Sequence, residues 1–150
     1  MELGDIRSTI LRTPLVKNLP EEMQPNFVMM LLYLSETREM SRGEILFLKG
    51  ECETDTGCVI LQGMVEVQCK EKAVFVEAPE IIGEMHLFTP EGARTATVEV
   101  TVGGMCLEFE WGALGTLARQ FYSAKELDTL KKSIVDYAWK RDASLFAKKN

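Results

Sequence analysis

The spacing of apolar residues changes twice along this chain of 150 residues, and those changes constrain its fold more than any other feature of the sequence. In the first and last parts of the chain, apolar residues recur three and four positions apart, as on one face of an amphipathic helix. Between them, apolar and polar residues alternate, as they do in strands with one buried face. The chain is therefore predicted to be mainly β, with helices at both ends.

The alternating region consists of short runs separated by glycine or polar residues. The clearest runs are "MVEVQC", "AVFVE", "TATVEVTV" and "MCLEFEW", with a polar "KEK" between the first two. We expect the Gly103–Gly104 pair to be the turn that joins the last two strands, because glycine tolerates turn conformations. Many short strands with regular spacing and glycine turns indicate a β-sandwich or barrel.

Prolines divide the N-terminal helical region into two segments. Apolar residues on one face of Gly4–Thr13 predict a short helix that ends at Pro14. A second helix is expected after Pro20, and Pro25 is expected to restart or kink it because proline lacks a backbone donor.

The C-terminal region predicts a helix from Ala113 to Phe121 and then a longer one. The long helix is expected to start at a capping box, "SAKE" (Ser123–Glu126), in which two side chains satisfy free backbone donors. An apolar stripe follows at spacings of three and four, and it has two interpretations. It packs against the protein's own barrel, or it forms the seam of a homodimer or a lid over a ligand. The stripe consists of Leu127, Leu130, Ile134, Tyr137, Ala138 and Leu145, and the first four are the residues expected in a dimer seam.

Composition and charge exclude several classes of protein. The formal net charge of −6 argues against non-specific nucleic-acid binding, which depends on Lys and Arg neutralising phosphates. No apolar run reaches the roughly 18–20 residues of a membrane helix, and the charged start of the chain does not predict a secretion signal. The four cysteines form no CxxC pair and are expected to be small buried or half-buried thiols in a reducing cytoplasm. At this length we expect one domain over residues 1–150.

The residue types needed for most catalytic sites are missing from the sequence. With one histidine, His86, the chain lacks the two His and one carboxylate that a barrel dioxygenase uses to bind iron. It contains neither a GxGxxG motif between a strand and a helix nor a Walker-type lysine loop. We therefore expect a protein that is not an enzyme, with no catalytic residue, no metal and no cofactor.

The segment "GEMHLFTPEGART", from Gly83 to Thr95, combines residues suited to binding a phosphorylated sugar. Gly83 lets the backbone approach a ligand, and the turn of helix predicted after it leaves N–H groups free for a phosphate. Arg94 can bind a phosphate through paired donors, with the Thr95 hydroxyl beside it, and Glu84 can accept hydrogen bonds from sugar hydroxyls. From the residues alone, a second interpretation is that Glu84 and Arg94 pair with each other or with solvent.

This segment resembles the phosphate-binding cassette of cyclic nucleotide-binding domains. It is especially similar to that of the bacterial catabolite activator family, which has Gly-Glu-x-x-Leu-Phe, a short loop and Arg-Ser/Thr-Ala. The resemblance extends over roughly residues 14–147 and includes, in the family's order, "PLVKNLPEE", "SRGEILFLKGE" and "CVILQGMVEV". It implies a β jelly roll (double-stranded β-helix) at about 42–111, with N-terminal helices at about 4–38 and C-terminal helices at about 113–147.

The resemblance also implies a role for each residue of the site. Arg94 would bind the cyclic phosphate, Glu84 would accept the ribose 2′-hydroxyl, and the base would lie against Val67 and Val76. The long C-terminal helix would close over the base, and in this family it commonly also forms a dimer seam. The phosphate would be held in addition by the Thr95 hydroxyl and by the backbone of Gly83, Glu84 and Met85.

His86 departs from this pattern, because the family usually has Ala, Gly or Ser at that position. A bulky ring there has three alternative consequences: it crowds the phosphate, its ring N–H adds a donor for the ligand, or it faces outward and contacts nothing. The "EAPEII" stretch before Gly83 is a second departure, since the family more often has a glycine–aspartate turn there.

We therefore expect a stand-alone cyclic nucleotide-binding regulatory domain in the cytoplasm. It would bind cAMP or cGMP and signal to an unidentified downstream protein, without an output domain of its own. The other interpretation is a degenerate domain of the same fold that has lost its ligand and serves as a protein-interaction or dimerisation module. Neither interpretation involves nucleic acid or a membrane.

Overall fold

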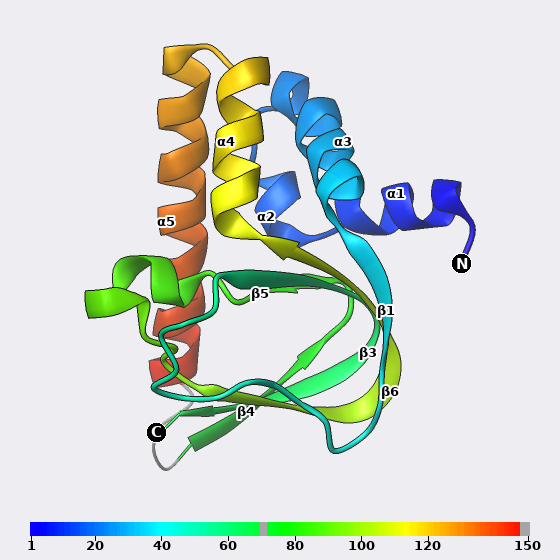
Figure 1. Ribbon diagram of the computed structural model, residues 1–150, viewed down its shortest axis with the longest axis vertical. Helices are drawn as coiled ribbons and strands as arrows, with labels where there is room; N and C mark the ends of the chain where they lie inside the picture. The colour runs from blue at the N-terminus through cyan, green and yellow to red at the C-terminus, as the bar shows by residue number, and fades with distance from the viewer. Residues whose placement is uncertain (70–71, 148–150) are drawn as a thin grey trace.

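The computed structural model describes residues 1–69 and 72–147 (Figure 1). The N-terminal helices are α1 (Leu3–Leu11), α2 (Pro14–Lys17), the 3-10 turn η1 (Glu21–Met23) and α3 (Gln24–Leu34). The strands are β1 (Glu36–Met40), β2 (Ile45–Phe47), β3 (Thr56–Cys69), β4 (Lys72–Glu77), β5 (Glu80–Ile82) and β6 (Thr97–Glu110). Two 3-10 turns lie between β5 and β6, namely η2 (Met85–Phe88) and η3 (Pro90–Gly92). The C-terminal helices are α4 (Trp111–Phe121) and α5 (Ala124–Ala147).

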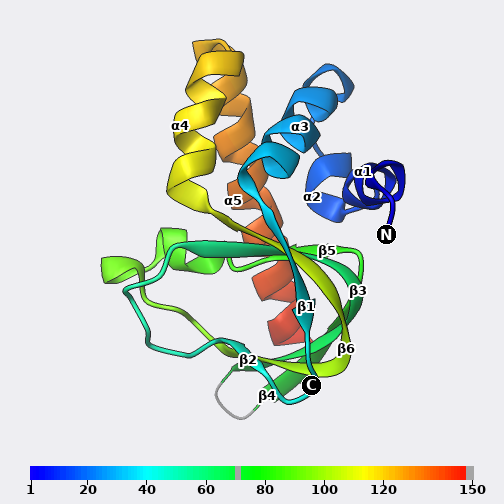
Figure 2. The same cartoon turned by 45° about the vertical axis from the view of Figure 1, so that its right-hand side comes forward.

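The strands form one antiparallel sheet that curls into a roll next to the helices (Figure 1 and Figure 2). The two long strands β3 and β6 pair with each other, and β1 and β4 extend the sheet beside β6 and β3. In addition, β2 pairs with β6 and β5 with β3. Helices α3 and α4 lie at one end of the roll, and α5 runs from that end along its side (Figure 1). The prediction of a mainly β jelly roll with helices before and after it is confirmed.

Parts of β3 and β6 have apolar core on both faces, so neighbouring residues there are buried together and do not alternate with exposed ones. Val59 and Leu107 belong to the larger apolar cluster, which includes the helices. Cys58 and Cys106, one residue away on each strand, belong to a second cluster in the interior of the roll. Successive side chains of a strand point to opposite faces, so neighbouring residues of β3 and of β6 belong to different clusters. All four cysteines are free thiols, and Cys52 is the exposed one.

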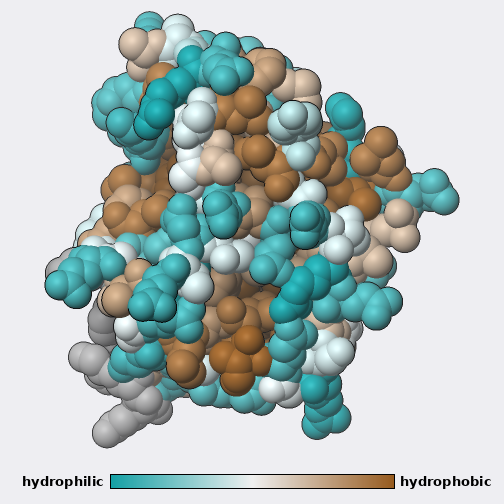
Figure 3. All heavy atoms as spheres, in the orientation of Figure 1, coloured by the Kyte–Doolittle hydropathy of each residue, from teal (hydrophilic) through white to brown (hydrophobic). Residues whose placement is uncertain are grey.

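The surface mixes polar and apolar residues, and on the face drawn in Figure 3 apolar residues are most visible over the helical end. Among the described residues, the most exposed large apolar side chains are those of Tyr33, Leu3 and Trp139. None of the described helices is both long and apolar enough to cross a bilayer.

The prediction of a turn at Gly103–Gly104 is wrong, because β6 runs through both glycines without a break. At this point the pairing of β3 with β6 shifts register between Gln62 and Met64, and Gly63 has a positive φ of +105°. The two backbones approach so closely that a Cβ at Gly104 would overlap the carbonyl group of Gln62. The glycines are therefore needed for a bulge where the two long strands bend, and not for a chain reversal.

The strands β1 and β5 are missing from the sequence-based prediction. The sequence predicts helix to about residue 38, whereas α3 ends at Leu34 and β1 begins at Glu36, so β1 overlaps the predicted helix. Its sequence, "ETREM", has one buried residue, Met40, and so it lacks the apolar alternation that identifies a strand. Pairing with β6 and ion pairs from Arg38 to Glu44 and Glu108 hold β1 in the sheet. A strand that backbone pairing and ion pairs hold in place needs few apolar residues, so its sequence lacks the alternation that predicts a strand.

The predicted helix starts are confirmed near both ends of the chain. Pro25 lies in the first turn of α3, where the N–H of a helix has no partner anyway, so it starts the helix and does not kink it. At the start of α5, the Ser123 N–H donates to Glu126 Oε1 at 2.9 Å, and the Glu126 N–H donates to Ser123 Oγ at 3.2 Å. These reciprocal bonds are the predicted capping box.

The apolar stripe of α5 packs against the protein's own core. Leu130 and Tyr137 are each 6% exposed, and Leu127 and Ile134 pack beside them against the larger cluster. The Tyr137 hydroxyl donates to the Ile81 carbonyl oxygen in β5 at 2.6 Å, which fixes α5 to the roll. Of the two interpretations of the stripe, packing against the protein's own core is confirmed for the described residues.

A buried tyrosine after α4 predicts a loss of stability at alkaline pH. Tyr122 is 5% exposed, and its hydroxyl donates to the Met23 carbonyl oxygen at 2.7 Å. Burial, with a smaller contribution from Glu126, raises the pKa of Tyr122 from its ordinary 10.0 to about 12. The folded state therefore holds this proton more tightly than the unfolded state. The resulting stabilisation is complete below about pH 10 and is lost as the pH rises through about 12.

Urea unfolding at several pH values measures this effect in the wild type and in Tyr122→Phe. The wild type is expected to lose about 1–3 kcal/mol through this group between about pH 9 and pH 12. The variant has no proton to lose, so its stability should fall less over that range, although it starts lower because it lacks the bond to Met23. The same pH dependence in both proteins would show that Tyr122 is not the group responsible.

Candidate functional site

The segment from Gly83 to Thr95 leaves β5, makes the short helical turn η2, and returns to β6 through a loop that contains η3. The turn, η2, is the one predicted from the sequence. Gly83 has a φ of +95°, which favours glycine, and a Cβ there would lie 2.8 Å from the Phe47 ring. A turn of four residues offers few free N–H groups. Arg94 is therefore the main candidate in this segment for binding an anion.

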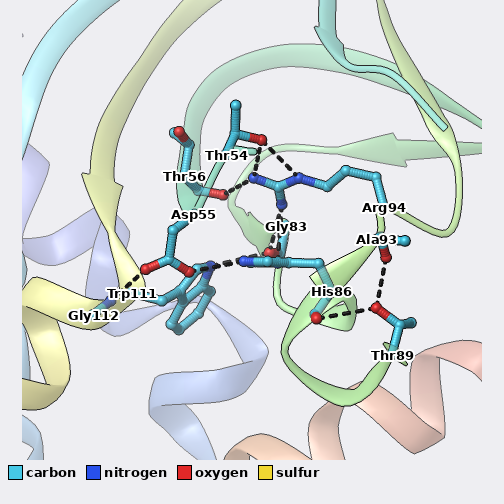
Figure 4. Close-up of polar contacts among 10 residues, drawn as sticks. All are labelled: Thr54, Asp55, Thr56, Gly83, His86, Thr89, Ala93, Arg94, Trp111 and Gly112. Atoms are coloured by element: carbon cyan, nitrogen blue, oxygen red, sulfur yellow. Dashed lines mark hydrogen bonds and ion pairs between the residues drawn. The ribbon is translucent and has the colours of Figure 1, made fainter. Parts of the chain in front are cut away.

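Arg94 is buried, and each N–H of its guanidinium has an acceptor within the protein (Figure 4). Nη1 donates to the Gly83 carbonyl oxygen and to His86 Nδ1, both at 3.0 Å. Nη2 donates to the Thr56 carbonyl oxygen at 2.9 Å and to Thr54 Oγ1 at 3.1 Å. Nε donates to the same Thr54 Oγ1 at 3.3 Å. Because arginine has five N–H donors, these bonds use all of them.

The guanidinium of Arg94 is a buried cation that acidic side chains and an aromatic ring surround. Burial lowers the pKa of the Arg94 guanidinium, and the nearby acids Glu51, Asp55 and Glu84 oppose that shift. Arginine nevertheless stays protonated in proteins. The Phe47 ring of β2 covers one face of the guanidinium, with its centroid 4.3 Å from Arg94 Cζ. Hydrogen-bond acceptors, an aromatic ring and acidic groups thus surround the buried charge.

His86 lies between Arg94 and Asp55 and is 5% exposed. Its Nε2 is 2.9 Å from Asp55 Oδ1, and its Nδ1 is 3.0 Å from Arg94 Nη1. Arginine can only donate, so Nδ1 accepts, and the ring proton is on Nε2, from which it is donated to Asp55. The interpretation of His86 as an outward-facing side chain is therefore wrong. Both ring nitrogens have partners, so neither presents a free N–H to a ligand in this arrangement.

Asp55 connects this network to the start of α4 (Figure 4). Its Oδ2 accepts the Gly112 N–H at 2.7 Å, and its carbonyl oxygen accepts the Trp111 N–H at 3.0 Å. A carboxylate at the first turn of a helix satisfies a free N–H and interacts favourably with the helix dipole. The Trp111 indole N–H donates in turn to the Gly83 carbonyl oxygen at 3.0 Å. A continuous chain of hydrogen bonds therefore runs from the guanidinium to α4.

Sequence analysis misses the residues that face the guanidinium from another part of the chain. Thr54 and Thr56 lie 40 and 38 residues before Arg94. No spacing rule relates positions so far apart, so their proximity is a result of the fold. The one available signal is the stretch "ETDTG", which places hydroxyl and acid side chains together just before a long apolar strand.

The eight predicted ligand-binding residues occupy different places in the structure. Val67 and Val76 face the interior of the roll, in or against the cluster that contains Phe47. Met85 is half-buried and Thr95 is exposed. The remaining four lie at or beside the buried guanidinium: Gly83, Glu84, His86 and Arg94.

A cavity of about 190 Å³ lies in the roll next to the partners of Arg94. Its lining includes none of the eight predicted residues. Pockets for small organic ligands usually measure about 300–1,000 Å³, so this cavity is smaller than most. Within the described residues, no group of three or more His, Cys, Asp or Glu side chains is arranged to hold a metal ion. The cavity is lined by Arg38, Leu46, Phe47, Glu51, Thr54, Thr56, Cys58 and Glu108.

Comparison with known proteins identifies a family over the central part of the chain. The model of the cyclic nucleotide-binding domain matches residues 37–121, which is more than half of the chain and includes the whole segment around Arg94. No curated protein shows a significant sequence match.

Three solved structures share the fold. A candidate cyclic nucleotide-binding protein from Geobacter metallireducens GS-15 is 16% identical, with a TM-score of 0.66 over 94% of this chain and 98% of that one. The N-terminal domain of a transcriptional regulator from Streptomyces coelicolor A3(2) is 23% identical, with a TM-score of 0.61 over 93% and 94%. The c-di-GMP responsive global regulator CLP of Xanthomonas campestris is 18% identical, with a TM-score of 0.67 over 83% and 62%. At these identities the similarity establishes the fold alone.

Proposed function

Because the chain belongs to the cyclic nucleotide-binding domain family, we propose that it is a non-catalytic regulatory domain that binds cAMP or cGMP. The observation that supports this most is the presence of two buried, oppositely charged side chains in one segment, Arg94 at 4% and Glu84 at 1% exposure. Burying a charge is costly, so buried charges are kept where they have partners or a role in binding. A cyclic nucleotide requires a cation for its phosphate and an acceptor for its sugar hydroxyl, and this segment contains both.

Each residue has a defined role in this proposal. Arg94 binds the cyclic phosphate, Glu84 accepts the ribose 2′-hydroxyl, and the base lies against Val67 and Val76. Because Arg94 and Glu84 are buried, the ligand must take the place of protein groups that now cover them. Further contacts to the phosphate come from the Thr95 hydroxyl and from the backbone of Gly83, Glu84 and Met85.

The signalling element in this proposal is α5, which closes over the base and passes the signal to a downstream protein. Tyr137 fixes α5 to the Ile81 carbonyl oxygen, two residues before Gly83. A ligand can shift α5 only if its affinity differs between two positions of the helix. The contact between Tyr137 and β5 is therefore one that such a shift would have to change.

Isothermal titration of the full chain with cAMP and with cGMP tests the proposal. We expect a dissociation constant in the micromolar range or lower for at least one of them, and 5′-AMP, which lacks the cyclic phosphate, is the control ligand. A ligand with a dissociation constant of about 1 mM gains only about 4.1 kcal/mol of binding free energy. The absence of binding by both cyclic nucleotides at about that concentration would refute the proposal.

One observation supports a second candidate function, that of a protein-interaction or dimerisation module without a ligand. All five donors of Arg94 already have acceptors within the protein, so none is free for a phosphate. The same titration separates the two candidates, and light scattering at several concentrations measures the dimer. A dimer seam through Leu127, Leu130, Ile134 and Tyr137 would require α5 to leave the protein's own core.

A further inference from the structure

We propose that His86 is an internal occupant of the phosphate site, which competes with the ligand for the guanidinium of Arg94 and so sets the affinity of the site. The inference rests on the proposed function and adds to it a residue that determines affinity. It is based on the donor count at Arg94, on the position of His86 and on the acceptors that surround the guanidinium.

Arg94 has no N–H donor left over for a phosphate, so a phosphate and His86 compete for the same donor. A phosphate binds arginine through paired N–H donors, and all five N–H groups of Arg94 are already used within the protein. His86 Nδ1 and a phosphate oxygen are both acceptors, so one Nη1–H cannot serve both fully. A phosphate therefore has to replace at least one acceptor in order to bind Arg94.

His86 is the acceptor that can leave at the lowest cost. The Gly83 and Thr56 acceptors are main-chain carbonyl oxygens, which the backbone holds directly after the end of β5 and at the start of β3. Thr54 Oγ1 accepts from both Nε and Nη2, so its release breaks two bonds. His86 is a side chain on the short turn η2, and it accepts a single bond from Arg94. The second bond that it would lose on leaving is to Asp55, a half-exposed carboxylate that water can solvate.

Asp55 holds His86 in this position from the other side. It accepts the Nε2–H of His86, and that bond keeps the proton away from Nδ1, which is the nitrogen that must accept from Arg94. The Asp55 side chain is itself 44% exposed, so water can solvate it when the ring moves. The bond to Asp55 therefore favours the position of His86 beside Arg94, and its loss would not leave a buried carboxylate without a partner.

Two substitutions at one position separate this role from a merely structural one. His86→Ala removes the competing acceptor and should increase the affinity for the cyclic nucleotide about tenfold or more, as expected when a ligand no longer has to displace a hydrogen bond to a charged group. His86→Asn places an amide oxygen near the position of Nδ1, so the competitor is retained and the affinity should stay close to that of the wild type. Leu87→Ala, at an exposed residue of the same turn, is the control and should have no effect.

Which nitrogen of the His86 ring carries the proton can be measured without any ligand. Because His86 is the only histidine of the chain, ¹⁵N NMR of the imidazole gives one pair of ring nitrogens. We expect a protonated Nε2 and an unprotonated Nδ1 in the free protein. A proton on Nδ1 would overturn the proposal, since Arg94 could not then donate to it.

The outcomes distinguish this inference from the function on which it rests. Tighter binding by His86→Ala but not by His86→Asn supports it, whereas equal affinities in all the proteins overturn it and leave the proposed function standing. If no variant binds a cyclic nucleotide, the proposed function fails, and titration with inorganic phosphate then decides the role of His86. Competition is supported if phosphate shifts the NMR signals of the Arg94 side-chain N–H groups in His86→Ala and not in the wild type. No shift in either protein, or the same shift in both, overturns it.

Discussion

Replacing Arg94 with alanine is expected to abolish ligand binding and to lower the free energy of unfolding by about 3–5 kcal/mol. Binding is lost because the guanidinium is the proposed phosphate ligand. Stability is lost because five hydrogen bonds disappear, and the Thr56 carbonyl oxygen and His86 Nδ1 lose the donor that Arg94 provides inside the protein. The Phe47 ring also loses the cation that it covers.

Urea unfolding measures the change in stability, and titration calorimetry measures the change in affinity. Arg119→Ala is the matched control, because Arg119 is exposed on α4 and its removal should change stability by less than about 0.5 kcal/mol. Arg94→Lys keeps the charge without the fork of paired donors, so it should unfold less readily than Arg94→Ala and still bind the ligand poorly.

The contribution of the second buried charge is expected to be smaller. Glu84→Ala should weaken cyclic nucleotide binding less than Arg94→Ala does, because a sugar hydroxyl is neutral whereas the phosphate is charged. An unchanged affinity in Arg94→Ala would remove Arg94 from the site. An unchanged stability in the same variant would contradict the hydrogen-bond network described around it.

Replacing Gly104 with alanine is expected to cost more than about 3 kcal/mol or to prevent folding. The new Cβ would overlap the carbonyl group of Gln62 and lie 2.9 Å from the Gly63 nitrogen. These atoms belong to the backbone of β3, so no side-chain rotation can relieve the overlap. Relief would require separation of β3 and β6, the two strands on which the other strands of the sheet pair.

The control for this prediction is the same substitution at Gly115 in α4. A Cβ at that position would have no atom within 4 Å apart from its chain neighbours and the backbone of its own helix, and alanine is favoured over glycine inside a helix. Gly115→Ala should therefore raise the free energy of unfolding by about 0.5–1 kcal/mol. Circular dichroism during thermal and urea unfolding compares the two variants. A Gly104→Ala protein as stable as the wild type would show that the strands are further apart than described.

The elements that a sequence predicts well here are those whose signal is local. Alternation identifies β4, β6 and the second half of β3, and the capping box at Ser123 and Glu126 marks the start of α5. The turn at η2 is local as well. The glycines at 103 and 104 are misread because the reason for them is the backbone of β3, which lies far away in the sequence. β1 is missed because pairing with β6 replaces the apolar pattern of an ordinary strand.

The candidate site divides in the same way. Gly83, Glu84 and Arg94 are recognised from one stretch of sequence, since a motif of thirteen residues contains all of them. Thr54, Asp55 and Phe47 are not recognised, because they come from the chain before β3 and in β2. Folding brings them to the guanidinium by pairing strands that are far apart in sequence.

The sequence by itself determined the fold class, the family and the segment in which to look for a ligand, because periodicity and short motifs are properties of neighbouring residues. The state of that segment was decided only by the tertiary structure. Glu84 and Arg94 could be read as a pair of ligand contacts, yet the acceptors of Arg94 are His86 and residues that lie up to 40 positions away. The five N–H donors of Arg94 meet their acceptors only in the folded chain. There His86, a departure from the motif in the sequence, is a hydrogen-bond partner of Arg94, and we propose that it competes with a phosphate.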